Sequence, residues 1–401
     1  MQQLIEEWQQ RVQDASANKV GLRLRGGGSK DWYGQQLQGE VLDTRAYAGI
    51  VAYEPSELVL TARCGTPLAE LEAVLAEKGQ TLAFEPPHFL RNGRHGHSAG
   101  AASATSVSSE SNAVGAATLG GMLAAGLAGP ARASQGCVRD FLLGVQLLDG
   151  RGQVLTFGGQ VMKNVAGYDV SRVMAGSMGV LGLILQASLK VMPRPQAQAS
   201  LQFELDEPRA LQAMNQWATQ ALPVSASSWH DGVLRVRLAG ARAAVQAACQ
   251  RLGGQVLAGE VADVHWLSLR DQQHAFFNAG AAPLALLWRL SLPSTTPTLI
   301  LPGRQLIEWG GAQRWLLLTD VDLEALPQQA RTIRQVVAAS GGHATLFRTF
   351  GGAGASARQV GVFHPLPPAL MKIHTNLKAA LDPAGIFNPG RLYSELTIAG
   401  S

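Results

Sequence analysis

The sequence is short of cysteine and of charged residues, and each shortage excludes a class of protein. Its 401 residues contain three cysteines, which lie far apart and form no C-x-x-C pair. A zinc site, an iron–sulfur cluster and a disulfide framework therefore lack support, so we expect no metal and a reducing, cytoplasmic environment. Charged residues make up 15% and hydrophobic residues 46% of the chain, which excludes a disordered protein and favours a compact one.

Long apolar runs and long basic runs are absent as well. The N-terminal segment is charged, with Leu4, Ile5, Trp8 and Val12 at helical spacing, and it lacks the apolar core of a signal peptide. Residues 113–131 carry no charge but are mostly glycine and alanine, which favours a tightly packed backbone over a membrane span. We expect at most peripheral association with a membrane. The net charge of +4 comes from scattered basic residues, which suits small anionic ligands rather than nucleic acid.

Hydrophobic periodicity and turn residues predict an α+β protein. Strand-like runs at 20–24, 50–53 and 57–62 precede a helix that begins after Thr66-Pro67 and ends near Gly79. Further strand-like runs follow at 144–148 and 183–191, and Pro193-Arg194-Pro195 marks a domain boundary. Residues 200–345 alternate strands with alanine-rich helices, which predicts a second α+β domain with an antiparallel sheet. A helix over 368–381 and a turn-rich tail complete the pattern.

Residues 91–112 form a low-complexity stretch that is rich in serine, alanine, glycine and histidine. This composition predicts a flexible surface insertion. His95 and His97 lie within it and could suggest a metal site, but a solvated loop explains them better.

Three glycine-rich segments carry the candidate binding chemistry, and the first reads RGGGSK from Arg25 to Lys30. It directly follows a predicted strand, and its consecutive glycines let backbone N–H groups turn toward an anion, with the Ser29 hydroxyl beside them. The pattern matches neither the P-loop nor the Rossmann fingerprint, so an ATPase or a Rossmann-type NAD-binding protein loses its main support. Taken alone, this loop is explained equally well as an ordinary turn.

The other two segments follow the same principle. Residues Thr118 to Met122 read TLGGM, where small residues allow close approach to a ligand or, alternatively, close packing of backbone on backbone. The third segment runs from Val161 to Asp169 and continues from Gly176 to Ile184. It predicts a strand–turn–strand with glycines at the turn. Lys163 and Asp169 in it are either functional or ordinary surface charges.

In this order and spacing, the three segments resemble the FAD-binding domain shared by vanillyl-alcohol oxidase and p-cresol methylhydroxylase (PCMH). In that family the first two segments hold the FAD pyrophosphate, and the third contacts the adenine-side nucleotide through its backbone. The tail at 382–391, DPAGIFNPGR, also fits the family pattern. The cofactor-binding residues that the resemblance implies are Arg25, Gly26, Gly27, Gly28, Ser29, Lys30, Pro87, Thr118, Gly120, Gly121, Lys163, Gly176, Ser177, Gly179, Gly182, Ile184 and Asn388.

The resemblance also implies a domain plan. We expect a two-lobed PCMH-type FAD-binding domain over residues 1–195, and a smaller α+β cap domain with an antiparallel sheet on the substrate side over 196–345. Residues 346–401 are expected to return to the FAD-binding domain and pack on it.

A narrower resemblance covers nearly the whole chain. The segments LRGGGSK, FEPPHF, VRDFLLG, VMKNVAGYD, LWRLSLP and GGHATLFR are similar to the family of small FAD-binding subunits of glycolate oxidase. The 91–112 insertion departs from that family's usual pattern. The resemblance implies oxidation of a small 2-hydroxy acid, glycolate, to glyoxylate by hydride transfer to flavin N5. It also implies a larger FAD-binding glycolate oxidase subunit and an iron–sulfur subunit as partners, because no cysteine cluster is present to accept the electrons.

Candidate catalytic residues follow from the same resemblance. Arg270 and then Arg289 are candidates for binding the substrate carboxylate, and His274 and His343 are candidate bases. A structural ion pair or a packing histidine is the alternative for each. Catalytically complete relatives carry an H-x-G-D-G-N-x-H motif, which residues 341–348 lack. Two other functions therefore stay open: a subunit that holds FAD for structure or electron relay without a substrate site of its own, and a self-sufficient flavin oxidase of another small hydroxy compound.

Overall fold

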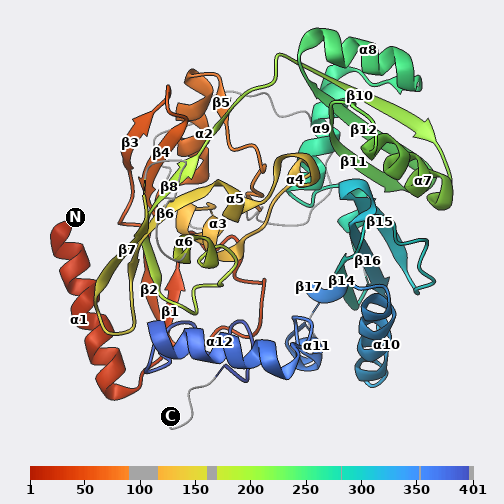
Figure 1. Cartoon of the computed structure of the whole chain (residues 1–401). Coiled ribbons are helices and arrows are strands. Elements are labelled where there is room, and N and C mark those ends of the chain that lie inside the picture. The colour runs from red at the N-terminus through yellow and green to blue at the C-terminus, as the bar shows by residue number, and fades with distance from the viewer. Residues whose placement is uncertain (90–115, 160–168, 281, 352–353, 397–401) are drawn as a thin grey trace.

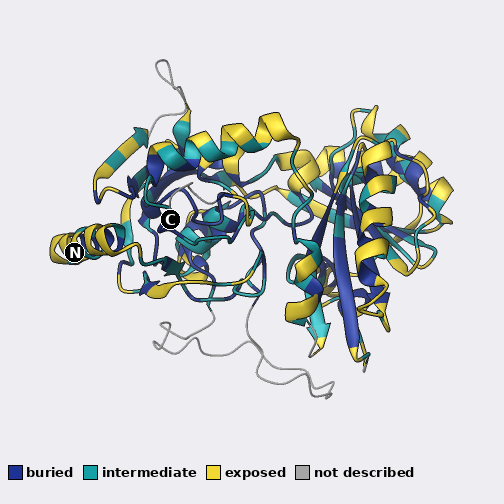
Figure 2. Ribbon diagram, turned by 90° about the horizontal axis from the view of Figure 1, so that it is seen from below, coloured by how far each residue is buried: buried dark blue, intermediate teal, exposed yellow. Residues whose placement is uncertain are grey.

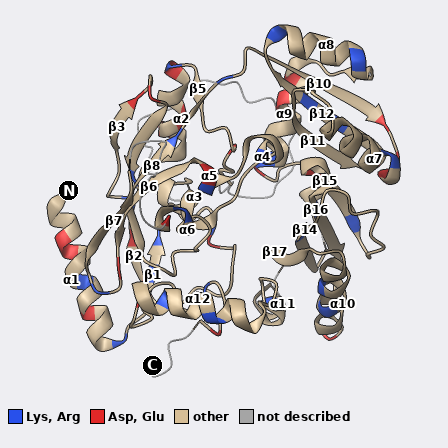
Figure 3. Ribbon diagram, in the orientation of Figure 1, with Lys and Arg blue, Asp and Glu red and all other residues tan. Residues whose placement is uncertain are grey.

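The protein folds into two lobes that lie side by side, and a C-terminal helix runs along the first lobe toward the second (Figure 1). This computed structural model describes residues 1–89, 116–159, 169–280, 282–351 and 354–396. Buried residues concentrate in the centre of each lobe, whereas the outer helices are exposed (Figure 2). Basic and acidic residues are intermixed over the outer helices of both lobes (Figure 3).

The first lobe is built on a five-stranded antiparallel sheet in the order β3-β4-β8-β6-β7. Its central strand, β8 (Leu183–Lys190), is buried along most of its length, as expected for a strand covered on two sides. Helix α2 (Leu68–Glu77), which the sequence predicts, buries Leu68, Leu71 and Leu75 completely along one face. The other strands are β3 (Ile50–Glu54), β4 (Val59–Arg63), β6 (Leu142–Leu148) and β7 (Val154–Gly158).

A small parallel pair, β1 (Leu22–Arg25) and β2 (Glu40–Asp43), stands beside this sheet. Helix α1 (Gln2–Asn18) buries Ile5, Trp8 and Val12, so the predicted N-terminal helix is present. Short elements complete the lobe: β5 (Gln80–Thr81), α3 (Leu119–Ala125), α4 (Arg132–Gln135), α5 (Val138–Phe141), α6 (Val170–Val173) and β9 (Met192–Pro193).

The second lobe contains an eight-stranded antiparallel sheet in the order β13-β10-β12-β11-β15-β16-β14-β17. One face packs against amphipathic helices, and the other faces the first lobe, where Leu287, Leu306 and Leu317 share a core with Leu127. The strands are β10 (Ala197–Glu204), β11 (Val224–His230), β12 (Val233–Gly240), β13 (Gln255–Val256), β14 (Leu284–Ser291), β15 (Arg304–Glu308), β16 (Gln313–Thr319) and β17 (His343–Gly351).

The sheet's hairpins and helices follow their local sequence. Strands β11 and β12 are joined by Asp231-Gly232, both at positive φ, which is the turn that suits a two-residue hairpin. Helix α7 begins at an Asp206 side chain that accepts a hydrogen bond from the Arg209 N–H. The helical elements are α7 (Glu207–Ala218), α8 (Arg242–Leu252), α9 (Gly259–Arg270), η1 (Ala275–Phe277), η2 (Trp309–Gly311), α10 (Leu326–Ala339), α11 (Gly354–Ala357) and η3 (Arg358–Val360).

The α+β class and the antiparallel sheet of the second lobe are confirmed. Of the third glycine-rich segment, residues 161–168 lie outside the described residues, whereas residues 176–182 form a turn that leads into β8. The short helix α6 (Val170–Val173) lies between the two parts of that segment. The Asp169 carboxylate caps this helix by accepting from the Arg172 N–H, and such a cap favours a helix over an extended chain. The last strand of the sheet, β17, runs to Gly351, six residues beyond 345. The insertion at 91–112 and Lys163 lie outside the described residues.

The C-terminal segment packs on the first lobe through a buried ion pair. Helix α12 (Pro368–Leu381) places the Lys378 ammonium 2.6 Å from the Asp382 carboxylate, and both side chains are almost fully buried. Lys378 Nζ also donates to the carbonyls of Val180 (2.7 Å) and Phe387 (3.0 Å). Asp382 accepts from the N–H groups of Ile386 and Phe387. The pair therefore fixes the tail against the loop before β8.

We predict that Lys378→Met destabilises the protein by about 3–5 kcal/mol, because it leaves the Asp382 carboxylate buried without its counter-charge. Chemical denaturation followed by circular dichroism measures the change. Lys372→Met is the matched control, since Lys372 is an exposed lysine on the same helix, and it should unfold like the wild type. Equal denaturation midpoints for the two variants would contradict the role given to the buried pair.

Candidate functional site

A pocket in the first lobe gathers the glycine-rich segments that the sequence singles out. We call it the glycine pocket. It encloses about 810 Å³, open solvent at its mouth included. The predicted residues that line it are Arg25, Gly26, Gly27, Gly28, Ser29, Lys30, Thr118, Gly120, Gly121, Gly179, Gly182, Ile184 and Asn388.

The glycine loop after β1 sits so close to its neighbours that no side chain fits there. A Cβ at Gly27 would lie 1.6 Å from the Ala116 carbonyl oxygen, and one at Gly26 would lie 2.3 Å from the Thr118 hydroxyl. Within the described residues, no hydrogen bond uses the backbone N–H groups of Gly27, Gly28 or Ser29. A row of uncommitted N–H donors is the donor set that fits a pyrophosphate such as that of FAD.

The second and third segments are joined to each other through helix α3. The Thr118 hydroxyl caps this helix, accepting from the Gly121 N–H. At the other end of α3, the N–H groups of Gly176 and Met178 donate to the carbonyls of Leu123 (2.9 Å) and Ala124 (2.8 Å). The turn between α6 and β8 is therefore held against α3, and it brings Gly179 and Gly182 to the pocket wall.

Two residues of the tail, Asn388 and Arg391, form hydrogen bonds with the loops that build the pocket. Asn388 Oδ1 accepts from the Leu24 N–H (2.8 Å), and its Nδ2 donates to the Met178 carbonyl (2.7 Å). Arg391 donates to the carbonyls of Asp31 (2.9 Å), Tyr33 and Gln35, which orders the chain that follows the glycine loop. Burial lowers the pKa of Arg391 to about 10. The polar atoms of both side chains form hydrogen bonds with backbone groups, so we expect these residues to position the loops rather than to contact a ligand.

Not every predicted cofactor residue lines this pocket. Gly176 and Ser177 precede the part of the turn that faces it, and Pro87 lies at a different cavity. Sequence reasoning missed several lining residues, among them Leu37, Thr44 and Cys64, because no local motif marks them. Arg391 could have been found, since it ends the DPAGIFNPGR tail.

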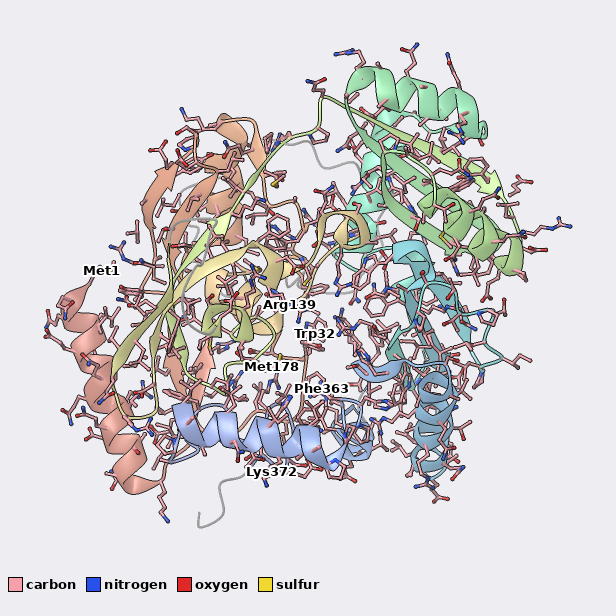
Figure 4. All side chains as sticks on the ribbon, viewed as in Figure 1. Met1, Trp32, Arg139, Met178, Phe363 and Lys372 are labelled. Carbon is pink, nitrogen blue, oxygen red and sulfur yellow. The ribbon has the colours of Figure 1, made fainter. Side chains whose placement is uncertain are left out.

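A second cavity, which we call the interlobe cavity, lies between the two lobes. The first lobe contributes Pro87, Phe89 and residues 127–130, and the second lobe contributes residues from α9, β14, β15, β16 and β17. Trp32, which contacts Phe89 and Phe347 edge to face, stands at this junction (Figure 4). The polar side chains in its wall are those of Arg270, Gln272, Arg289, Glu308 and Gln313.

The two predicted arginines both line the interlobe cavity, but they differ in their partners. Arg270 forms an ion pair with Asp271 at 2.8 Å, which neutralises much of its charge. Arg289 has no acidic partner among the described residues. It lies 5.4 Å from the centre of the Phe347 ring and makes one long hydrogen bond, 3.5 Å, to the Tyr33 hydroxyl. Of the two cations, Arg289 is the more available to an anionic ligand.

Lys30 links the two cavities. It lines the glycine pocket, and its ammonium lies 5.7 Å from the centre of the Phe89 ring, which lines the interlobe cavity. Burial lowers the pKa of Lys30 to about 8, and the nearby Asp271 carboxylate opposes that shift. A ligand that extends from one cavity to the other would pass this lysine.

Neither candidate histidine lines the interlobe cavity. His274 caps η1 by accepting from the Phe276 N–H (3.2 Å), and burial lowers its pKa to about 4. His343 begins β17 in an exposed position. The cavity instead contains a carboxylate that sequence reasoning missed, that of Glu308, which is 3% exposed. Its burial raises its pKa to about 7.

The described residues contain neither a metal-binding cluster nor a membrane-spanning helix. No three or more histidine, cysteine, aspartate or glutamate side chains are grouped so that they could hold a metal ion. In the same part of the chain, every helix is too short or too polar to cross a membrane.

Comparisons with known proteins agree with this geometry. The model of a family described as an FAD binding domain matches residues 3–113. The glycolate oxidase subunit GlcE of Escherichia coli (strain K12) is 42% identical over 98% of this chain and 98% of that protein. The glycolate oxidase subunit GlcD of Bacillus subtilis (strain 168) is 26% identical over 44% of this chain and 42% of that protein.

The fold has a solved counterpart. A structure of alkyldihydroxyacetonephosphate synthase superposes with a TM-score of 0.62 at 16% identity, covering 96% of this chain and 76% of that one. At that identity the likeness supports the fold alone. The relationship to GlcE extends over almost the full length of both chains. The chain therefore belongs to the family of the glycolate oxidase subunit GlcE, and it is an FAD-dependent oxidoreductase subunit.

Proposed function

We propose that this protein is the FAD-binding subunit of a multi-subunit complex that oxidises glycolate, a small 2-hydroxy acid, to glyoxylate. The observation that carries the proposal is the closeness of the two cavities. The glycine pocket offers backbone N–H groups, the interlobe cavity contains an arginine with no acidic partner among the described residues, and Lys30 of the first lies 5.7 Å from the centre of the Phe89 ring of the second. FAD is long enough to need such a pair of adjoining spaces.

The glycine pocket supplies the residues that would hold the cofactor. Gly27, Gly28 and Ser29 offer their N–H groups to the pyrophosphate, and the Gly179 to Ile184 turn would line the adenine side. Bound FAD supplies an acceptor for the hydride that leaves the carbon bearing the hydroxyl. The chain's own part is to bind and orient the substrate and to keep water away from it.

The interlobe cavity supplies the substrate's binding groups. A 2-hydroxy acid carries a carboxylate, and Arg289 is a cation whose charge no described carboxylate neutralises. Arg270, already paired with Asp271, would add a second donor and help to orient the substrate. Gln272 lines the same wall, and both polar atoms of its buried side-chain amide lack hydrogen-bond partners among the described residues.

The partners follow from the route that electrons must take. The cysteines Cys64, Cys137 and Cys249 are all free and separate, so among the described residues there is no cluster to accept electrons from the flavin. We propose that they pass to an iron–sulfur subunit, and that a larger FAD-binding subunit completes the complex. Such a complex would place the protein in the cytoplasm, with any membrane contact made through its partners.

An anaerobic visible spectrum tests the proposal. The chain is purified alone and within its native complex, and the flavin bands are recorded before and after glycolate is added. Bleaching in the isolated chain would support a substrate site of its own. Bleaching only in the complex would favour a relay or structural role for this subunit. Flavin that no 2-hydroxy acid reduces in either sample would refute the proposed function.

For the cofactor site, we predict that Gly27→Ala weakens FAD binding roughly 5- to 150-fold, since relieving an overpacked contact costs about 1–3 kcal/mol. The added Cβ would collide with the Ala116 carbonyl, so the loop must move. The flavin absorbance per chain after purification, and titration with FAD, measure the effect. Gly259→Ala is the matched control, because a Cβ there meets no atom within 4 Å. An unchanged FAD affinity in Gly27→Ala would show that this loop does not bind the cofactor.

For the substrate site, we predict that Arg289→Met weakens glycolate binding roughly 10- to 150-fold, because a hydrogen bond to a charged group contributes about 1.5–3 kcal/mol. FAD content should not change. The dissociation constant is measured from the flavin spectrum at increasing glycolate concentration. Arg331→Met, on the exposed face of α10, is the control for loss of one arginine. A dissociation constant equal to that of the control would remove Arg289 from the substrate site.

A further inference from the structure

The interlobe cavity contains a carboxylate, that of Glu308, to which the proposed binding of FAD and substrate assigns no role. Among the described residues that line this cavity, Glu308 is the only carboxylate. It ends β15 on the sheet face that meets the first lobe, the same face that carries Leu306. Burial of an unneutralised charge is costly, so a carboxylate at this position suggests a functional role.

The two oxygens of Glu308 have different environments. Oε2 accepts hydrogen bonds from the Trp315 indole N–H (2.6 Å) and from the Gln313 side-chain amide (3.1 Å). Oε1 has no hydrogen-bond donor among the described residues, although the side chain is 3% exposed. One oxygen is therefore fixed in place, and the other is left free toward the cavity.

The backbone beyond Glu308 is anchored to the opposite wall. Trp309 adopts a left-handed φ of 55°, and its indole N–H donates to the Gly129 carbonyl (3.1 Å), which belongs to the first-lobe side of the cavity. The Gly310 N–H donates to the Ser227 hydroxyl (2.9 Å). A strained residue held by contacts with both lobes keeps the carboxylate at a fixed position between them.

We propose that Glu308 accepts the hydroxyl proton of the 2-hydroxy acid as its carbon is oxidised, an inference that rests on the proposed function. The substrate O–H bond breaks, and its proton moves to Glu308 Oε1, so that the carboxylate becomes a neutral acid. The electron pair of that bond forms the carbonyl, while the hydride of the adjacent C–H bond leaves to the oxidised flavin. Substrate loses two electrons and two hydrogens, and the flavin gains the two electrons with one of those hydrogens.

The charges around Glu308 suit this role. Arg270 and Arg289 line the same cavity and would hold the substrate carboxylate away from the glutamate. Glu85 raises the pKa of Glu308 further, although Glu85 is itself paired with Arg237 at 2.8 Å. With burial as the main cause, the pKa of Glu308 lies near 7, which is close to the value that suits a general base at neutral pH.

The test uses Glu308→Gln, which keeps the size and the hydrogen-bonding capacity of the side chain. The FAD-loaded chain, alone and within its native complex, is mixed anaerobically with glycolate, and the rate of flavin bleaching is recorded from pH 5 to 9. In the wild type the rate should rise with an apparent pKa of about 7. In Glu308→Gln it should fall by about 10²- to 10⁴-fold and lose this rise, while FAD content and the glycolate dissociation constant stay unchanged. Glu204→Gln, an exposed carboxylate on the same sheet, is the matched control.

A second measurement needs no substrate. The folded-state pKa of about 7 lies above that of an unfolded glutamate, so the folded protein binds more protons between the two values. The stability of the wild type should therefore decrease as the pH rises from about 4.5 to about 7 and level off above that, and Glu308→Gln should lose this decrease.

Wild-type bleaching with a Glu308→Gln rate and pH profile like those of the control would overturn the role of Glu308 and leave the proposed function standing. If no 2-hydroxy acid bleaches the wild-type flavin at any pH, the proposed function fails and the proton-acceptor role fails with it. The pH dependence of stability would then still report whether Glu308 titrates in its buried site.

Discussion

The amide of Asn388 is the interaction on which the glycine pocket depends. Its oxygen accepts from Leu24 at the end of β1, and its nitrogen donates to Met178 in the turn before β8. Among the described residues, no other side chain forms hydrogen bonds with both of these walls, which come from opposite ends of the first lobe's sequence. A side chain from the last twentieth of the chain therefore sets the width of a pocket built by the first half. The buried Lys378–Asp382 pair holds that side chain in place.

The two lobes contribute different kinds of group. The first lobe offers backbone N–H groups, because its glycines pack too tightly against Ala116 and Thr118 for side chains to intervene. The second lobe offers side chains from an antiparallel sheet, where neighbouring strands fix their spacing. A backbone cradle suits a large cofactor with a diphosphate, whereas a set of side chains suits a small polar substrate. The cavities meet at Lys30 and Phe89, where the two kinds of recognition adjoin.

The sequence predicted the fold class and the glycine loops well, since both depend on local patterns. Gly26 to Ser29 could be singled out because three glycine-rich segments follow one another in a characteristic order and spacing, and the helix over 368–381 because its periodicity is regular. It could not predict Glu308. That residue's place follows from sheet register, which sets it opposite Gln313 and diagonal to Trp315. Gln272 was missed because its place in the cavity wall depends on the backbone after α9, where Gln272 has a left-handed φ of 54° that the sequence does not reveal. The sequence ranked Arg270 above Arg289 because it does not show that Arg270 forms an ion pair with Asp271.

The position of the tail also has a consequence for the order of synthesis. The glycine loop leaves the ribosome long before Asn388 and Arg391 do. Until these two residues emerge, the loop at 30–35 lacks the guanidinium that orders it, and the pocket lacks the amide that joins its walls. A chain that stops short of residue 388 would keep the glycine motif intact and yet lack the side chain that joins β1 to the turn before β8.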